Sequence, residues 1–207
     1  MATKNSIDSN IPIEIAKGGT NAASMATSLG ILKYNGTSLV TSAAAKISAS
    51  DVMTNTSQPS FYAHLNGVSD TNSTGNGVRY TFGSLAAPTI TLNRGSCLSA
   101  TGVFTVPVSG VYLLNFILSL SNLAAGHTGL SINLATSGYI VELFTGNPFA
   151  MVSSSGLFTC CCSMACSLTA AQTFTANCIV TGGTQTVTVV GSTGNHSYTS
   201  FSGCLLC

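Results

Sequence analysis

Apolar and polar residues alternate with a period of two along much of the chain after residue 57. Between residues 111 and 120 every second residue is apolar, and Asn115 and Ser119 fall on the opposite side of this pattern. Successive side chains of a strand point to opposite faces, so the alternation predicts strands with one face in a core. The segments 157–168 and 173–180 show the same pattern and predict two more such strands.

Shorter apolar segments, separated by Gly, Asn, Ser and Thr, continue this pattern. Many short strands with glycine-rich turns such as Gly182-Gly183 indicate a β-sandwich or barrel, so the predicted fold class is all-β. These additional strands are predicted at 60–65, 79–82, 89–92, 103–106, 130–134, 139–144, 185–190 and 198–206. The polar segments 67–78, 122–129, 146–155 and 192–197 are predicted to be loops between core strands.

Residues 1–57 differ from the remainder and are interpreted as a stem or attachment segment, followed by a head over 58–207. A short helix is predicted over 22–29, capped by Thr20 or Asn21 and ended by Gly30. Residues 31–34 and 37–40 predict two strands joined by a type I′ turn at Asn35-Gly36. Elements this small cannot bury a core alone, which favours a stem formed by several chains together.

The chain is poor in charge, with six Lys and Arg and five Asp and Glu among 207 residues. Its net charge of +1 and the lack of a basic cluster argue against nucleic acid as a partner. The polar start Met1-Ala-Thr-Lys-Asn predicts no secretory signal peptide. The densest apolar run, about ten residues long, has roughly half the length of a transmembrane helix, so no membrane insertion is predicted.

Eight cysteines raise the question of disulfides or a zinc site. The alternation places Cys160, Cys162, Cys166 and Cys178 on core faces, where a free thiol behaves as a small apolar group. We therefore expect reduced cysteines used for packing, with a disulfide or a metal as open alternatives. A calcium site is not expected, because it needs several carboxylates and the head has only two acidic residues, Asp70 and Glu142.

No catalytic arrangement is recognisable in the sequence. His64, His127 and His196 are far apart, and no Ser/His/Asp set or pair of carboxylates accompanies them. The glycine-rich segment 75–77 lacks the lysine and the following helix of a phosphate-binding loop. The sequence therefore predicts no enzyme, no metal and no cofactor.

Three motifs in the head resemble those of C1q/TNF-like globular heads. They are Gln58-Pro-Ser-Phe61 with Ala63-His-Leu-Asn66, the Phe-x-x-Pro-x-x-Gly-x-Tyr run of 104–112, and Ser200-Phe-Ser-Gly-Cys-Leu-Leu206. The resemblance implies a jelly roll of about ten strands, a homotrimer and a binding module rather than an enzyme. The signature and core residues that it assigns are Phe104, Pro107, Gly110, Tyr112, Phe116, Phe201, Gly203 and Leu205.

The stem carries a second resemblance. Ile15-Ala-Lys-Gly-Gly-Thr20, together with the segment 30–40, is similar to linkers of bacteriophage tail fibres and related viral fibre proteins. This resemblance implies a virion or extracellular location, with the stem joined to other fibre or virion proteins.

The leading hypothesis is therefore a trimeric adhesive tip whose loops bind a host-surface receptor, with a glycan among the candidate ligands. The expected receptor-contact residues are polar and lie in the predicted loops: Asn72, Asn76, His127, Asn147, Asn195 and His196. One alternative is a structural building block of a filament or a capsid decoration. Another is a secreted C1q-type recognition protein.

Overall fold

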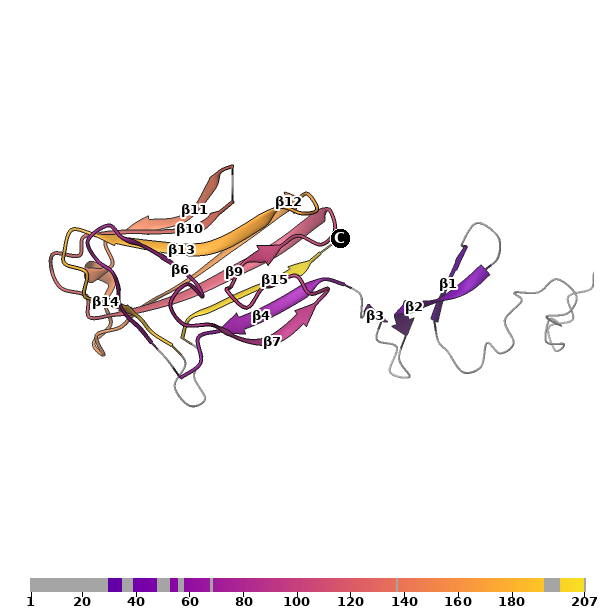
Figure 1. Cartoon of the computed structure of the whole chain (residues 1–207), viewed down its shortest axis with the longest axis horizontal. Helices are drawn as coiled ribbons and strands as arrows, with labels where there is room; N and C mark the ends of the chain where they lie inside the picture. The colour runs from indigo at the N-terminus through magenta and orange to yellow at the C-terminus, as the bar shows by residue number, and fades with distance from the viewer. Residues whose placement is uncertain are drawn as a thin grey trace, which may run out of the picture. The chain divides into compact units, whose positions relative to one another are not determined.

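A computed structural model describes residues 30–34, 39–47, 53–55, 58–67, 69–136, 138–191 and 198–206 (Figure 1). The chain forms two compact units, Met1–Ser57 and Gln58–Cys207. We call them the stem and the head and describe each by itself.

The described part of the stem is a three-stranded antiparallel sheet in the order β1 (Gly30–Tyr34), β2 (Leu39–Ile47) and β3 (Met53–Asn55). β1 and β2 pair where the hairpin was predicted, with Lys33 opposite Val40. β3 is an additional strand that the sequence pattern did not predict. The predicted helix over 22–29 and the Asn35-Gly36 turn lie outside the described residues.

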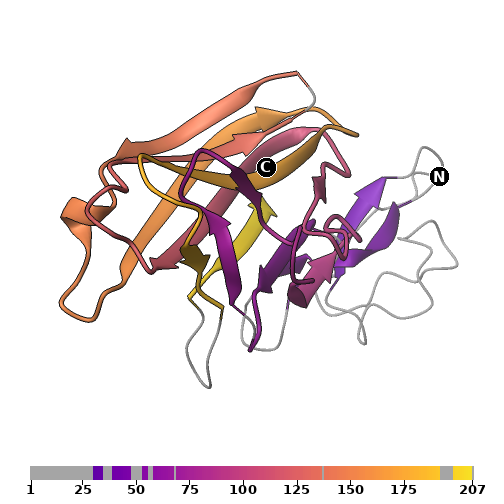
Figure 2. The ribbon, with the colours of Figure 1, turned by 60° about the vertical axis from the view of Figure 1, so that its left-hand side comes forward.

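The head consists of two antiparallel sheets, which appear as two layers in Figures 1 and 2. Sheet I has the order β7 (Thr89–Arg94), β4 (Ser60–His64), β15 (Ser200–Leu205), β9 (Gly110–Ser121) and β12 (Phe158–Leu168). At one end of β9, β14 (Val187–Val189) also pairs with it and carries β5 (Asp70–Thr74) on its other side. Sheet II has the order β11 (Ile140–Gly146), β10 (Gly129–Ala135) and β13 (Thr173–Thr181), and β13 then pairs with β6 (Arg79–Thr81) and β8 (Phe104–Thr105).

The connections between these strands define a jelly roll. After β9 in sheet I the chain crosses to β10 and β11 in sheet II, returns to β12, crosses again to β13 and ends with β14 and β15 in sheet I. The first and last strands of the head are neighbours, with Phe61 opposite Gly203. Two antiparallel sheets joined by repeated crossings of this kind are the jelly-roll architecture, and the all-β prediction is confirmed.

The strand faces follow the predicted alternation. In β9 the apolar side chains from Tyr112 to Leu120 are buried, and they alternate with half-buried residues such as Asn115 and Ile117. β12 pairs with β9 along its full length, with Cys162 opposite Phe116. Each sheet therefore presents one apolar face to the other sheet.

Aromatic side chains fill the space between the sheets. The ring of Phe61 lies 4.9 Å from the rings of both Phe104 and Phe201, measured between centroids. Phe116 and Phe82 extend this cluster through edge contacts. Buried aromatic rings contribute large apolar areas, so this cluster accounts for much of the stabilisation of the head.

A corner before β9 is fixed by a single side chain. The hydroxyl of Tyr112 donates a 2.8 Å hydrogen bond to the carbonyl oxygen of Val108, four residues earlier. Pro107 and Gly110 flank this corner, and Pro107 restricts the backbone there. The bond lets a buried tyrosine keep its hydroxyl satisfied while holding the bend that leads into the central strand.

β5 corrects one sequence expectation, because Asp70–Thr74 falls inside the segment predicted as a loop. Its residues are polar and show no alternation, so the sequence pattern does not indicate a strand. Pairing with β14 forms it, and the buried Thr74 hydroxyl bonds both to the Val78 carbonyl oxygen and to the Val180 backbone N–H. Polar residues can be buried here because hydrogen bonds, both local and from the distant β13, satisfy them.

Among the residues that the structure describes, no helix has the length and hydropathy needed to cross a bilayer.

Candidate functional site

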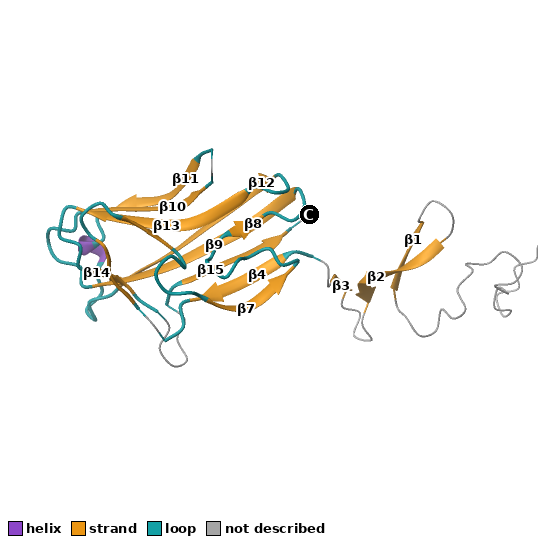
Figure 3. Ribbon diagram, in the orientation of Figure 1, coloured by secondary structure: helices purple, strands orange, loops and turns teal. Residues whose placement is uncertain are grey.

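Three loops gather at one end of the head, opposite the end at which the chain enters it (Figure 3). They are residues 75–78 between β5 and β6, 122–128 between β9 and β10, and 182–186 between β13 and β14. We call this group the loop cluster. Loops at the end of a rigid sandwich are common binding positions. The exposed residues of the loop cluster are therefore candidates for contact with a partner.

His127 is the centre of the loop cluster. Its Nδ1 accepts a hydrogen bond from the Ala124 N–H, and its Nε2 donates to the Thr184 carbonyl oxygen at 2.9 Å. These roles correspond to a neutral ring with its proton on Nε2. The side chain is only 1 % exposed, so His127 positions two loops and is removed from the predicted receptor contacts.

Two glycines allow the loops to approach each other. A Cβ on Gly75 would lie 2.0 Å from the Thr184 carbonyl oxygen, and its φ of +132° is unfavourable for other residues. A Cβ on Gly183 would lie 2.3 Å from the His127 ring. The Gly183 N–H also bonds to the Gly75 carbonyl oxygen at 3.1 Å. The backbones of the 75–78 and 182–186 loops therefore pack directly against each other.

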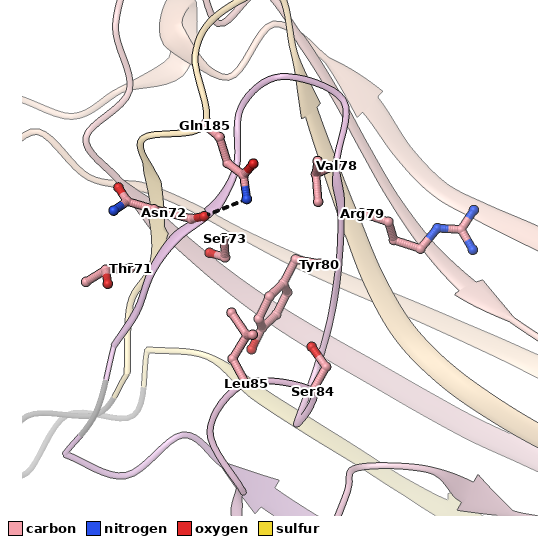
Figure 4. Close-up of a pocket in the computed structure, with 9 residues that line it drawn as sticks. All are labelled: Thr71, Asn72, Ser73, Val78, Arg79, Tyr80, Ser84, Leu85 and Gln185. Carbon is pink, nitrogen blue, oxygen red and sulfur yellow. Dashed lines mark hydrogen bonds between the residues drawn. The ribbon is translucent and has the colours of Figure 1, made fainter.

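A pocket of about 260 Å³ lies beside the loop cluster, between β5, β6 and Gln185 of the β13–β14 loop (Figure 4). Its buried part is formed by Ser73 and Tyr80, and exposed side chains from both strands and the following loop surround it. Its other lining residues are Thr71, Asn72, Val78, Arg79, Ser84 and Leu85.

Two of the predicted contact residues belong to this region. Asn72 lines the pocket and has a φ of +52°, and its carbonyl oxygen accepts a 2.9 Å hydrogen bond from Gln185 Nε2. Asn76 is exposed and donates from Nδ2 to Gln185 Oε1 at 3.3 Å. The structure thus brings Asn72 and Asn76 together through Gln185, a residue that no sequence motif indicated.

The remaining predicted contacts are placed elsewhere or not described. Asn147 is exposed in the β11–β12 connection, where its Oδ1 accepts from the Ala150 N–H beside a short 3-10 helix, η2 (Phe149–Met151). Asn195 and His196 lie outside the described residues.

The outward face of sheet I is uncharged over β4, β15, β9 and β12. Leu113 and Ile117 lie at its centre, and the side chains exposed on β12 are small. In register order these outward residues include Tyr62, Ser202, Asn115 and Ser163 in one row, and His64, Ser200, Ile117 and Cys161 in the next. A face without formal charge and with apolar residues at its centre is suited to contact another protein surface.

The outward face of sheet II has the opposite character. Thr81 Oγ1 donates to Asn177 Oδ1 at 2.7 Å, and Asn177 Nδ2 donates to Asn133 Oδ1 at 3.3 Å. Glu142 stands next to Asn133 in the same row and is exposed. This row of polar side chains crosses four strands, and its two asparagines are buried with their amides paired, while Glu142 is exposed.

The cysteines lie on the faces that the alternation predicts. Cys162 and Cys178 are buried, while Cys160 and Cys166 pack partly buried against the core. The sulfurs of Cys160 and Cys162 are 3.6 Å apart and are not bonded covalently. Burial raises the pKa of Cys178 to about 12, and burial together with Cys160 raises the pKa of Cys162 to about 12. These two thiols are held in their protonated form at neutral pH.

In the described ranges, no group of three or more His, Cys, Asp or Glu side chains is arranged to hold a metal ion. The two acidic residues of the head are also apart in the fold, since Asp70 is buried on β5 and Glu142 is exposed on β11.

The signature residues of the head serve its core and corners. Phe104, Tyr112, Phe116 and Phe201 are buried. Pro107 and Gly110 lie half-buried at the corner before β9, and Leu205 packs partly buried against the core. Gly203 is buried where a Cβ would lie 2.6 Å from the Leu114 side chain and 2.7 Å from the Phe61 ring.

The strand order thus defines an antiparallel jelly roll with a loop-bearing end and two unlike outward faces. Solved structures similar to it include murine APRIL at pH 8.0, with 17 % identity and a TM-score of 0.45 over 72 % of this chain and 99 % of that chain. Eiger TNF from S. frugiperda has 14 % identity and a TM-score of 0.44 over 72 % and 93 %.

The globular domain of the zebrafish complement 1qA protein has 17 % identity and a TM-score of 0.43 over 72 % of this chain and 98 % of that chain. No protein-family model matches the sequence. No curated protein matches it either.

Proposed function

We propose that the protein is a non-enzymatic recognition head that forms a homotrimer and acts as the adhesive tip of a phage or viral fibre. The outward face of sheet I carries this proposal, because it combines apolar residues with a complete lack of formal charge on β4, β15, β9 and β12. Three copies packed around a threefold axis through this face bury Leu113 and Ile117. The outward face of sheet II, with the exposed Glu142, then lies outside this interface.

The loop cluster supports a recognition role for the distal end of this trimer. It is held by the His127 ring and by close glycine contacts, so it is ordered before any partner binds. A preformed surface loses little conformational freedom on binding. Three copies on one trimer also present three identical sites, which gives a multivalent contact with a host-surface receptor.

The stem supports the fibre part of the proposal through its linker-like segment Ile15-Ala-Lys-Gly-Gly-Thr20. In this function the stem joins other fibre or virion proteins, and the head meets the receptor. The location that follows is the virion.

Two measurements on the full chain test the proposal. Light scattering coupled to size exclusion should give three times the mass of the chain, and a stable monomer would refute the trimer. Fluorescently labelled protein should bind candidate host cells saturably and in competition with unlabelled protein. Growth into filaments without saturable cell binding would identify a structural building block instead.

A further inference from the structure

The pocket beside the loop cluster has a composition that suits one class of ligand. Val78 and Leu85 line it from two different connections, and they are 43 % and 63 % exposed although both are apolar. Around them stand neutral polar groups, among them Gln185, Thr71 and Ser84. Small-molecule sites commonly combine apolar surface with a few fixed polar groups in this way.

The buried part of the pocket is rigid. The Tyr80 hydroxyl donates to Asp70 Oδ2 at 2.7 Å, and Ser73 Oγ donates to the Asp70 carbonyl oxygen at 2.7 Å. Thr74 Oγ1 also donates a 2.6 Å hydrogen bond to the Val78 carbonyl oxygen, which fixes the backbone next to the pocket. A ligand therefore meets a preformed surface and orders few side chains when it binds.

Gln185 is fixed across the pocket with part of its bonding capacity unused. Its Nε2 donates to the Asn72 carbonyl oxygen, shown by the dashed line in Figure 4, and its Oε1 accepts from Asn76. A side-chain amide has two N–H donors and two lone pairs on oxygen, so one donor and one lone pair remain. This oriented amide can both donate to and accept from a hydroxyl group.

The lining favours a ligand without a strong charge. Arg79 is the one charged residue among the lining residues, and its guanidinium extends away from the other labelled side chains in Figure 4. No carboxylate lines the pocket, so nothing there would hold a cation. A ligand with hydroxyls at its edge, C–H groups on its face and no net charge matches this surface.

We propose that the pocket binds one neutral pyranose unit of a host-surface glycan, with Val78 and Leu85 against its C–H face and Gln185 at its hydroxyls. This inference rests on the proposed recognition function and names the ligand class and the site for it. A pocket of about 260 Å³ is of a size that admits one such ring rather than a peptide or a long chain.

The test uses the full-length protein and free monosaccharides. Saturation-transfer NMR and calorimetry should detect binding of a neutral sugar from the set galactose, glucose, mannose and N-acetylglucosamine. Val78→Ser and Leu85→Ser should each weaken that binding by about fivefold to tenfold through loss of apolar contact. Val108→Ser is the matched control, because Val108 is 46 % exposed and does not line the pocket, and it should leave binding unchanged. Light scattering and thermal unfolding establish that each variant keeps the assembly and fold of the original protein.

Each result has one meaning. Binding of neutral sugars that is unaffected by both pocket variants overturns the proposal, and so does binding restricted to the acidic sugar N-acetylneuraminic acid. If Val78→Ser and Leu85→Ser bind host cells as tightly as the original protein, the pocket is not the receptor site and the adhesive function stands. If the pocket variants lose sugar binding but the original protein does not bind cells, the pocket is supported and the adhesive function fails.

Discussion

The hydroxyl of Tyr80 donates a hydrogen bond of 2.7 Å to Oδ2 of Asp70, and both side chains are buried. Asp70 belongs to β5 on the side of sheet I, and Tyr80 belongs to β6 in sheet II. The bond therefore joins the two layers of the head. It also gives a buried carboxylate a partner in a head that has very few charged residues.

Tyr80→Phe should destabilise the head by about 1.5–3 kcal/mol, because a buried carboxylate loses its hydrogen-bond donor. The free energy of unfolding from urea titration measures this loss. Tyr139→Phe is the control, since Tyr139 is 47 % exposed, and its effect should stay within about 0.5 kcal/mol. Equal stability of the two variants would show that Tyr80 and Asp70 do not contribute in this way.

Gly203→Val should destabilise the head by about 1–3 kcal/mol or more through overpacking. A side chain at this position meets Leu114 and Phe61 at distances that require one of them to move. Thr145→Val is the control, because Thr145 is exposed on β11 in the other sheet and lies outside the proposed interface. Thermal unfolding should rank the original protein and Thr145→Val together, well above Gly203→Val.

Stability should fall at alkaline pH because of Cys178. Burial raises the pKa of this thiol from 9.0 to about 12 in the folded state, so the unfolded chain releases its proton first as pH rises. The contribution of the protonated Cys178 thiol to the free energy of unfolding is complete below pH 9. It decreases from pH 9 toward pH 12, by about 1.4 kcal/mol per pH unit for one thiol.

Urea unfolding of the original protein and of Cys178→Ala at about pH 8 and about pH 10 checks this expectation. The variant starts less stable, but the difference between the two proteins should shrink as the pH rises. A difference that stays constant would mean that Cys178 ionises alike in the folded and unfolded states.

Ile117→Asp should convert the proposed trimer into monomers, because three carboxylates would enter an apolar interface. Ile179→Asp makes the same change on the outward face of sheet II and should leave the mass unchanged. Both isoleucines are half-buried in the single chain, so the comparison separates assembly from folding. Loss of assembly in both variants, or in neither, would contradict the assignment of the interface to sheet I.

The alternating segments could be predicted because their periodicity is dictated by burial on one face. β9, β12 and β13 carry this pattern and were found within one or two residues of their predicted limits. β5 could not be found this way. Its Asp70, Ser73 and Thr74 side chains are buried by pairing with a distant strand, and part of the compensating hydrogen bonding comes from Val180, about a hundred positions away.

The candidate site illustrates the same limit. Asn72 and Asn76 could be proposed from their polar surroundings, but Gln185, which links them, is more than a hundred residues away. His127 lies in a polar, glycine-containing segment that favours exposure, and only the folded arrangement of three loops buries it. Sequence patterns describe local burial well, whereas contacts between loops depend on the complete fold.

The first and last strands of the head lie side by side, and Gln58 donates from its side chain to the Leu205 carbonyl oxygen. The two ends of the domain therefore leave it at one place, far from the loop cluster. Domains with adjacent ends can be inserted into or exchanged between other chains with little disturbance. In evolutionary terms such a head can be exchanged as one unit, and under the proposed adhesive function changes in the loop cluster would alter ligand preference without affecting this junction.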